Sequence, residues 1–149
     1  MTRIEFFFNV DNKAQKVAVL AEMIIAKGRQ LYVFVPNHTF AQQLDDYLWA
    51  YQSSSFLPHA IVSSEDEAIN DEVCESSSFL IDSKANNLQH DDVMINFALD
   101  VPVFFSRFLR LIEVVGLDEA DKIAARKRFR LYREQGYDIK SFDEFEHAL

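Results

Sequence analysis

Two strand-like segments alternate with two helical segments at the start of the chain. Residues 3–8 (RIEFFF) form an apolar, aromatic run typical of a buried strand, and residues 13–26 carry apolar side chains at helical spacing before Gly28. Residues 31–35 (LYVFV) are a second run of β-branched and aromatic residues, and residues 40–48 repeat the helical spacing. This order, with its short connections, favours a parallel sheet covered by helices.

The rest of the chain extends this pattern into a three-layer α/β domain with a mostly parallel sheet. A helix is predicted from about residue 118 to residue 135, closed by Gly136. We expect residues 137–149 to trail along the surface. The other predicted elements are three strands and one short helical turn, at residues 79–82, 93–99, 109–115 and 102–108. Nothing marks a boundary, so residues 1–149 are predicted to form a single domain.

The composition is that of a globular protein with one core. Of the 149 residues, 49% are hydrophobic, and fourteen are Phe. No apolar run approaches the length of a membrane span, and the first residues are typical of a strand and not of a signal peptide. A single cysteine, Cys74, cannot close an intramolecular disulfide. We therefore expect a cytoplasmic protein.

The sequence contains no recognisable catalytic, cofactor or metal site. The segment after the first strand, NVDNKAQK, has neither the glycines of a dinucleotide-binding turn nor the GxxxxGK[ST] pattern of a P-loop. The predicted topology is thus Rossmann-like without a nucleotide-binding loop. No Cys/His cluster has zinc spacing, and we predict that the protein is not an enzyme. An enzyme that uses the crevice at the strand ends is the alternative.

Basic residues are concentrated near the end of an acidic chain. The formal net charge is −9, and no Lys or Arg occurs between Gln30 and Ser83. Six of the fifteen basic residues lie between Lys122 and Arg133, a stretch without any acid. Since local fields select charged partners, this asymmetry matters more than the net charge.

Four of these basic residues form a ridge on the predicted helix. At about 100° per residue, they fall within an arc of roughly 80°. The members of the ridge are Lys122, Arg126, Arg130 and Arg133. Like charges four residues apart repel, and an anionic partner would relieve the repulsion. That partner could be a nucleic acid or an acidic peptide; the alternative is a solvated helix face.

The side of the helix opposite the ridge is apolar and contains one exception. Its apolar members are Ala124, Ala125, Phe129, Leu131 and Tyr132. Arg128 projects into the middle of this side, so its guanidinium must either reach solvent or pair with a buried acid. Lys127 is expected to be a solvated flank.

Two segments resemble the chi subunit of bacterial DNA polymerase III holoenzyme. The first is LDDYLWAYQSSSFLPHAI, residues 44–61, and the second is EVVGLDEADKIAARKRFRLYREQGYDI, residues 113–139. The spacing agrees over nearly the full length, although the acidic, serine-rich connection at residues 63–78 and the turn GLDEAD differ. The resemblance implies a nucleotide-binding-type fold that does not bind nucleotides. It also implies a non-catalytic clamp-loader subunit, held by the psi subunit, that binds the acidic C-terminal tail of single-stranded DNA-binding protein.

The resemblance also implies two sets of site residues. Lys122, Arg126 and Arg130 match the tail-binding positions, Trp49 matches an aromatic wall, and the helical wheel adds Arg133. Core packing is the alternative for Trp49. Phe56, Leu57 and Pro58 match the part of chi that faces psi; the alternative is a loop that folds back onto the core.

Direct binding of single-stranded nucleic acid is the main alternative function. Such proteins interleave aromatic stacking platforms with an extended basic groove. Here the positive charge is confined to one helix, and the acidic half of the chain would repel a phosphate backbone. We therefore expect no strong direct binding of nucleic acid, and no membrane association.

Overall fold

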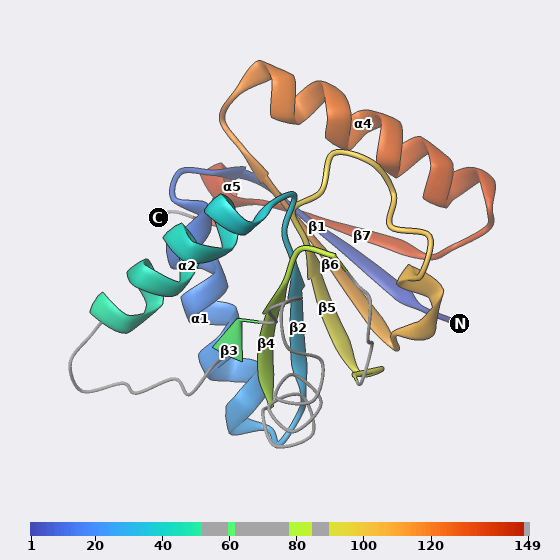
Figure 1. Cartoon of the computed structure of the whole chain (residues 1–149). Helices are drawn as coiled ribbons and strands as arrows, with labels where there is room; N and C mark the ends of the chain where they lie inside the picture. Colours follow the sequence, from blue (N-terminus) through green and yellow to red (C-terminus); the bar gives the residue numbers. More distant parts are fainter. Residues whose placement is uncertain (52–59, 62–77, 85–89, 148–149) are drawn as a thin grey trace.

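The structure, a computed structural model, describes residues 1–51, 60–61, 78–84 and 90–147. Strands alternate with helices at the beginning of the chain, as the sequence predicts (Figure 1). The first half comprises β1 (Arg3–Val10), α1 (Lys13–Ala26), β2 (Leu31–Phe34), α2 (His38–Ala50), β3 (Ala60–Ile61) and β4 (Phe79–Asp82). The second half comprises β5 (Val93–Asn96), the 3-10 helix η1 (Phe105–Arg107), β6 (Arg110–Gly116), α4 (Glu119–Glu134), β7 (Ile139–Asp143) and α5 (Glu144–His147).

The strands of the described residues form one parallel sheet with the order β3-β4-β2-β5-β6-β1-β7. Each pair of neighbours runs in the same direction, for example β1 beside β6 and β2 beside β4. The sheet separates two hydrophobic clusters, because successive side chains of a strand point to opposite faces. On β2, Leu31 and Val33 face the helices α1 and α2, whereas Tyr32 faces α4 and η1. The three-layer α/β fold is confirmed.

Local sequence signals explain where the helices begin and end. At the start of α1, the Asn12 side chain accepts a hydrogen bond from the backbone N–H of Gln15 at 3.0 Å. At the start of α2, the Asn37 side chain accepts one from the backbone N–H of Phe40 at 2.8 Å. Gly28 and Gly136, which follow α1 and α4, have φ angles of 74° and 86°. These angles lie in the left-handed region, where glycine is favoured at helix ends.

The predicted strands 79–82 and 109–115 and the helix 13–26 agree with the structure to within one residue at each end. The strand predicted over residues 93–99 ends earlier, at Asn96. The side-chain oxygen of Asn96 accepts a hydrogen bond from the backbone N–H of Ala98 at 2.9 Å, which turns the chain away from the sheet.

The expectation for residues 137–149 is wrong, because residues 139–143 form the edge strand β7. It pairs in parallel with β1, from Ile4 opposite Ile139 to Phe8 opposite Asp143. The rings of Phe7 and Phe142 stack across this pair, with centroids 5.0 Å apart. The strand is half-exposed, so it lacks the continuous apolar run that identified the buried strands.

No helix within the described part of the chain is both long and apolar enough to cross a membrane.

Candidate functional site

A buried ion pair attaches α4 to the sheet. Arg128 donates from Nε to Oε2 of Glu113 on β6 at 2.7 Å, and both side chains are almost completely buried, at 3% and 0% exposure. The Nη1 group of Arg128 also donates to the backbone oxygen of Leu99 at 2.9 Å. Of the two possibilities for Arg128, the structure shows the pairing with a buried acid.

Tyr132 completes this network from the next turn of α4. Its hydroxyl donates to Oε2 of Glu113 at 3.0 Å. Burial raises the pKa of Glu113, and the neighbouring Arg128 opposes that rise. Burial and the nearby Glu113 also raise the pKa of Tyr132, so the phenol keeps its proton and remains a donor. Two side chains one turn apart therefore bind a single carboxylate, which orients α4 about its own axis.

This orientation directs the four ridge residues toward the edge of the sheet. Lys122, Arg126, Arg130 and Arg133 line a groove of about 620 Å³ between α4 and β7. We call it the ridge groove. Its apolar floor consists of Phe8 from β1 and Phe129 from α4, and Ser141 and Asp143 of β7 form the opposite wall. Phe129 is held in place by Phe6, with ring centroids 5.2 Å apart.

The electrostatics of the ridge groove favour an anion. Asp143 is its one acidic lining residue, and this carboxylate accepts hydrogen bonds from Asn9 Nδ2 at 2.9 Å and from the backbone N–H of Phe145 at 3.0 Å. Asn9 has a φ of 59°, a left-handed conformation that Asn tolerates better than most residues. Among the described residues, no ion pair or hydrogen bond involves the side chain of any ridge residue. Four cations thus lie beside an apolar floor in a groove that contains one acidic residue, and none of the four is paired with it.

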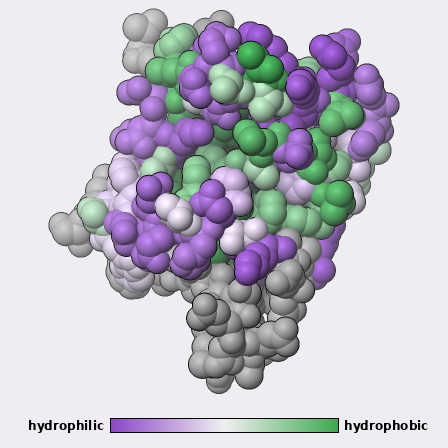
Figure 2. Space-filling view, turned by 45° about the horizontal axis from the view of Figure 1, so that its top comes forward, coloured by the Kyte–Doolittle hydropathy of each residue, from purple (hydrophilic) through white to green (hydrophobic). Residues whose placement is uncertain are grey.

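The other exposed side of α4 is partly apolar. Figure 2 views the molecule from the side on which α4 lies and shows hydrophobic side chains at the surface among hydrophilic ones. Ile123 and Leu131 of α4 are 49% and 45% exposed, and Leu99, next to Arg128, is 66% exposed. Leu131, predicted on the apolar side, therefore lies at its margin and not in the core.

Trp49 is not part of the ridge groove. It lies near the end of α2 and is 53% exposed, and its Nε1 donates to Oδ1 of Asp45 at 3.1 Å. Core packing is therefore excluded as its role. However, α2 covers the face of the sheet opposite to α4 and contacts β3 and β4, at the edge far from β7 (Figure 1). The structure brings the four ridge residues together but leaves Trp49 apart from them.

The predicted psi-facing residues Phe56, Leu57 and Pro58 lie outside the described residues. Most of the acidic connection at residues 63–78, including Cys74, lies outside them as well. These predictions are not tested by the structure.

Asp121, in the first turn of α4, contacts the carboxyl end of β6. Asp121 accepts a hydrogen bond from the backbone N–H of Gly116 at 2.7 Å and one from Lys13 Nζ at 3.3 Å. Within the described ranges, no cluster of three His, Cys, Asp or Glu residues could hold a metal ion.

The ridge groove contains two parts that sequence reasoning missed, namely its floor residue Phe8 and its wall β7. The available signal was the order of elements. A helix that follows a strand in an α/β chain commonly returns the chain to the sheet as a further parallel strand. Residues 139–143 follow α4 in the chain and form this further parallel strand.

Comparison with known proteins identifies the family. The chain matches the family of the DNA polymerase III chi subunit, HolC, over residues 1–140. It is 32% identical to DNA polymerase III subunit chi of Pseudomonas aeruginosa over 144 residues, which cover 94% of this chain and 95% of that protein. It is 29% identical to the subunit chi of Haemophilus influenzae over 122 residues, with coverages of 82% and 81%.

A solved structure of another protein shares the fold. The C-terminal domain of the DEAD-box protein Dbp5 is similar with a TM-score of 0.64 and 13% identity, over 97% of this chain and 91% of that domain. At this identity the likeness concerns the fold alone. By contrast, the sequence match includes the buried network of α4, the four ridge residues and the floor residues Phe8 and Phe129, and it ends before Ser141 and Asp143 of the groove wall. The chain belongs to the DNA polymerase III chi subunit family.

Proposed function

We propose that this protein is a non-catalytic accessory subunit of the replicative DNA polymerase III clamp-loader complex, acting in the cytoplasm. In this role it binds the acidic C-terminal tail of single-stranded DNA-binding protein and is held in the complex by a psi subunit. The observation that carries the proposal is the ridge groove, in which four cations without internal partners surround the floor formed by Phe8 and Phe129. Membership of the chi family supports the assignment to the polymerase complex.

The chemistry of the groove fits the tail that the family resemblance implies. Such a tail has acidic residues followed by an Ile/Leu-Pro-Phe end with a free carboxylate. Arginines bind carboxylates through two parallel hydrogen bonds, and an aromatic floor offers an apolar surface for the terminal ring. We expect Arg126 and Arg130, in the middle of the ridge, to contribute most. Lys122 and Arg133 extend the positive electrostatic field of the ridge to the two ends of the groove.

Trp49 enters this proposal as a separate contact. The edges of the sheet are six strand spacings apart, about 29 Å at roughly 4.8 Å per spacing, whereas five extended residues span at most about 18 Å. A short tail peptide bound in the ridge groove would therefore not reach an α2 side chain near the other edge. A longer segment could contact both.

The test is a titration with a peptide that ends in Asp-Asp-Ile-Pro-Phe. We expect Arg126→Glu to weaken peptide binding at least about tenfold, equivalent to about 1.4 kcal/mol. Lys127→Glu is the matched control, because it makes the same charge change at an exposed position of the same helix outside the groove. This control should retain the affinity for the peptide to within about threefold, because it loses only long-range electrostatic attraction. Equal loss in both variants would refute a specific site in the groove.

A parallel titration with oligo-dT separates this proposal from direct nucleic-acid binding. The isolated protein should bind the oligonucleotide negligibly at about 50 mM and about 200 mM salt, since the formal net charge of −9 repels a phosphate backbone and the ridge is confined to one helix. Tight oligonucleotide binding with a steep loss at the higher salt concentration would favour the alternative function.

The psi-facing surface is tested by co-expression with a psi-like partner. Phe56→Asp should weaken the complex, because an anchoring aromatic side chain is replaced by a charge. Ser53→Asp is the control, since it adds the same charge to the same segment without removing an apolar side chain. A complex that survives Phe56→Asp intact would show that the psi contact lies elsewhere.

A further inference from the structure

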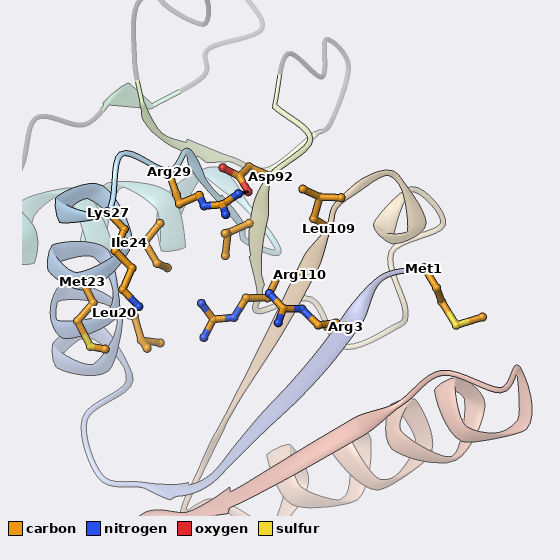
Figure 3. A pocket seen from close by; sticks show the side chains of 11 residues that line it. Met1, Arg3, Leu20, Met23, Ile24, Lys27, Arg29, Asp92, Leu109 and Arg110 are labelled. Carbon is orange, nitrogen blue, oxygen red and sulfur yellow. Dashed lines mark hydrogen bonds and ion pairs between the residues drawn. The ribbon is translucent and has the colours of Figure 1, made fainter.

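A second cationic cavity lies at the amino ends of the strands. It occupies about 400 Å³ between the C-terminal half of α1 and the first residues of β1, β5 and β6 (Figure 3). Arg3, Lys27, Arg29 and Arg110 line it, together with Asp92 and several apolar side chains. We call it the amino-edge cavity. None of the ridge residues belongs to it.

The positive charge of this cavity exceeds its internal counterions. Arg110 forms two hydrogen bonds with the carboxylate of Glu5, at 2.9 and 2.8 Å, and Arg29 pairs with Asp92 at 3.3 Å. Arg3 and Lys27 have no side-chain partner among the described residues. The cavity therefore presents two uncompensated cations, although the whole chain has a formal net charge of −9.

The arrangement of Arg3 is electrostatically unfavourable without a ligand. Arg3 lies directly opposite Arg110 in the register of β1 and β6, and Figure 3 shows the two side chains next to each other. Like charges that face each other across neighbouring strands destabilise a sheet. Because Glu5 already binds Arg110, Arg3 remains available at the surface to pair with an external anion.

The mouth of the cavity is apolar as well as cationic. Met1, Met23 and Leu109 are 90%, 54% and 59% exposed, and all three line the cavity. Leu20 and Ile24 of α1 lie deeper within it. Exposed large apolar side chains that gather around a hollow are typical of protein interaction sites, where Met and Arg are enriched.

We propose that the amino-edge cavity is a docking site for a short acidic segment of a partner protein, with one aliphatic side chain of that segment inserted beside Leu20 and Ile24. The carboxylates of the segment pair with Arg3 and Lys27. A nucleic acid fits less well, because no aromatic residue lines the cavity and Asp92 would face a continuous phosphate backbone. This site does not depend on the ridge groove, which α4 forms over the other face of the sheet.

The three methionines of the chain make a direct test possible. Met1 and Met23 line the cavity, whereas Met94 is fully buried in the cluster beneath α4. In protein labelled with 13C at the methionine methyl groups, the probe acetyl-Asp-Glu-Leu-Asp-Glu-amide should shift the NMR signals of Met1 and Met23 in a saturable manner. The signal of Met94 should remain unchanged and serves as the internal reference.

Control ligands distinguish this site from a simple anion site. The same peptide with Ser in place of Leu should bind at least about tenfold more weakly, because the burial of the aliphatic side chain contributes to binding. Inorganic phosphate and oligo-dT should not compete at equal concentration. The proposal is overturned if phosphate alone reproduces the shifts, if oligo-dT displaces the peptide, or if the two peptides bind equally.

Charge-reversal variants locate the site. Arg3→Glu and Lys27→Glu should each weaken peptide binding at least about fivefold, through the loss of one attraction and the gain of one repulsion. Arg107→Glu is the matched control, since Arg107 is exposed but does not line the cavity. Arg126→Glu should leave these shifts unchanged. A failure of the ridge groove to bind its tail can therefore be distinguished from a failure of the amino-edge cavity to bind its peptide. Equal loss in Arg3→Glu and Arg107→Glu would refute the assignment.

Discussion

Arg128 and Arg126 lie two residues apart on α4 and belong to opposite kinds of surface. Arg128 is 3% exposed at its side chain and is bound to Glu113 at 2.7 Å, inside the interface with the sheet. Arg126 is exposed, lines the ridge groove and has no ion pair among the described residues. One type of side chain, arginine, therefore stabilises the fold on one side of the helix and is available to a partner on the other.

This contrast shows how a run of basic residues should be divided. Burying the charge of Arg128 is costly unless it is paired and hydrogen-bonded, and here Glu113 and the backbone oxygen of Leu99 provide that pairing. An exposed cation carries no such requirement and can await an external anion. The buried pair also fixes the rotation of α4, and it thereby determines which residues form the ridge.

The largest expected effect follows from breaking the buried pair. Arg128→Met keeps an unbranched apolar side chain at this position but leaves the Glu113 carboxylate buried without its counterion. We expect a loss of about 3–5 kcal/mol in the free energy of unfolding, measured by urea denaturation. Tyr132 alone cannot compensate for the missing charge, because it donates a single hydrogen bond to Glu113.

Two further variants test the cause of that loss. Arg126→Met, on the outer side of the helix, should change the free energy of unfolding by less than about 0.5 kcal/mol. The double variant Arg128→Met with Glu113→Leu should recover part of the loss, because no unpaired charge remains in the interior. A single Arg128→Met variant as stable as Arg126→Met would contradict the division between the two sides of α4.

Most of the fold could be predicted from the sequence because the buried elements are identified by local patterns. Apolar runs indicated the strands, helical spacing indicated α1, α2 and α4, and Gly28 and Gly136 indicated where two helices end. β7 was missed because an edge strand needs only one neighbour. Its side chains alternate only weakly, and its position depends on β1, more than a hundred residues earlier.

The ridge could be predicted from the sequence, but the groove could not. The helical wheel placed the four cations together, and it indicated that Arg128 needs a partner if it is buried. Identifying Glu113 as that partner, or Phe8 as the floor of the groove, requires knowledge of which strands are neighbours. The amino-edge cavity escaped notice for the same reason, since Arg3, Lys27 and Arg110 are far apart in the sequence.

A second, smaller effect concerns salt. Raising the NaCl concentration from about 50 mM to about 500 mM shortens the screening length several-fold and should weaken tail-peptide binding to the exposed ridge by about tenfold. The buried pair is shielded from salt, so the difference in unfolding free energy between Arg128→Met and the unaltered protein should change by less than about 0.5 kcal/mol. Isothermal titration and urea denaturation at both salt concentrations measure the two quantities. Equal salt sensitivity would indicate that solvent reaches Glu113.

The smallest effect is expected at Trp49, where the position in the fold and the family resemblance lead to different expectations. Trp49 is 53% exposed on α2, so Trp49→Ala should change the free energy of unfolding by less than about 1 kcal/mol, and circular dichroism can confirm that α2 remains folded. If the ridge groove alone binds the short tail peptide, the affinity should fall by less than about twofold, against at least about tenfold for Arg126→Glu. A loss as large as that of Arg126→Glu would instead mean that the outer side of α4 is not sufficient for binding. If the ridge groove alone binds the short peptide, Trp49→Ala should weaken a longer tail more than the short peptide, because only the longer chain can span both edges of the sheet.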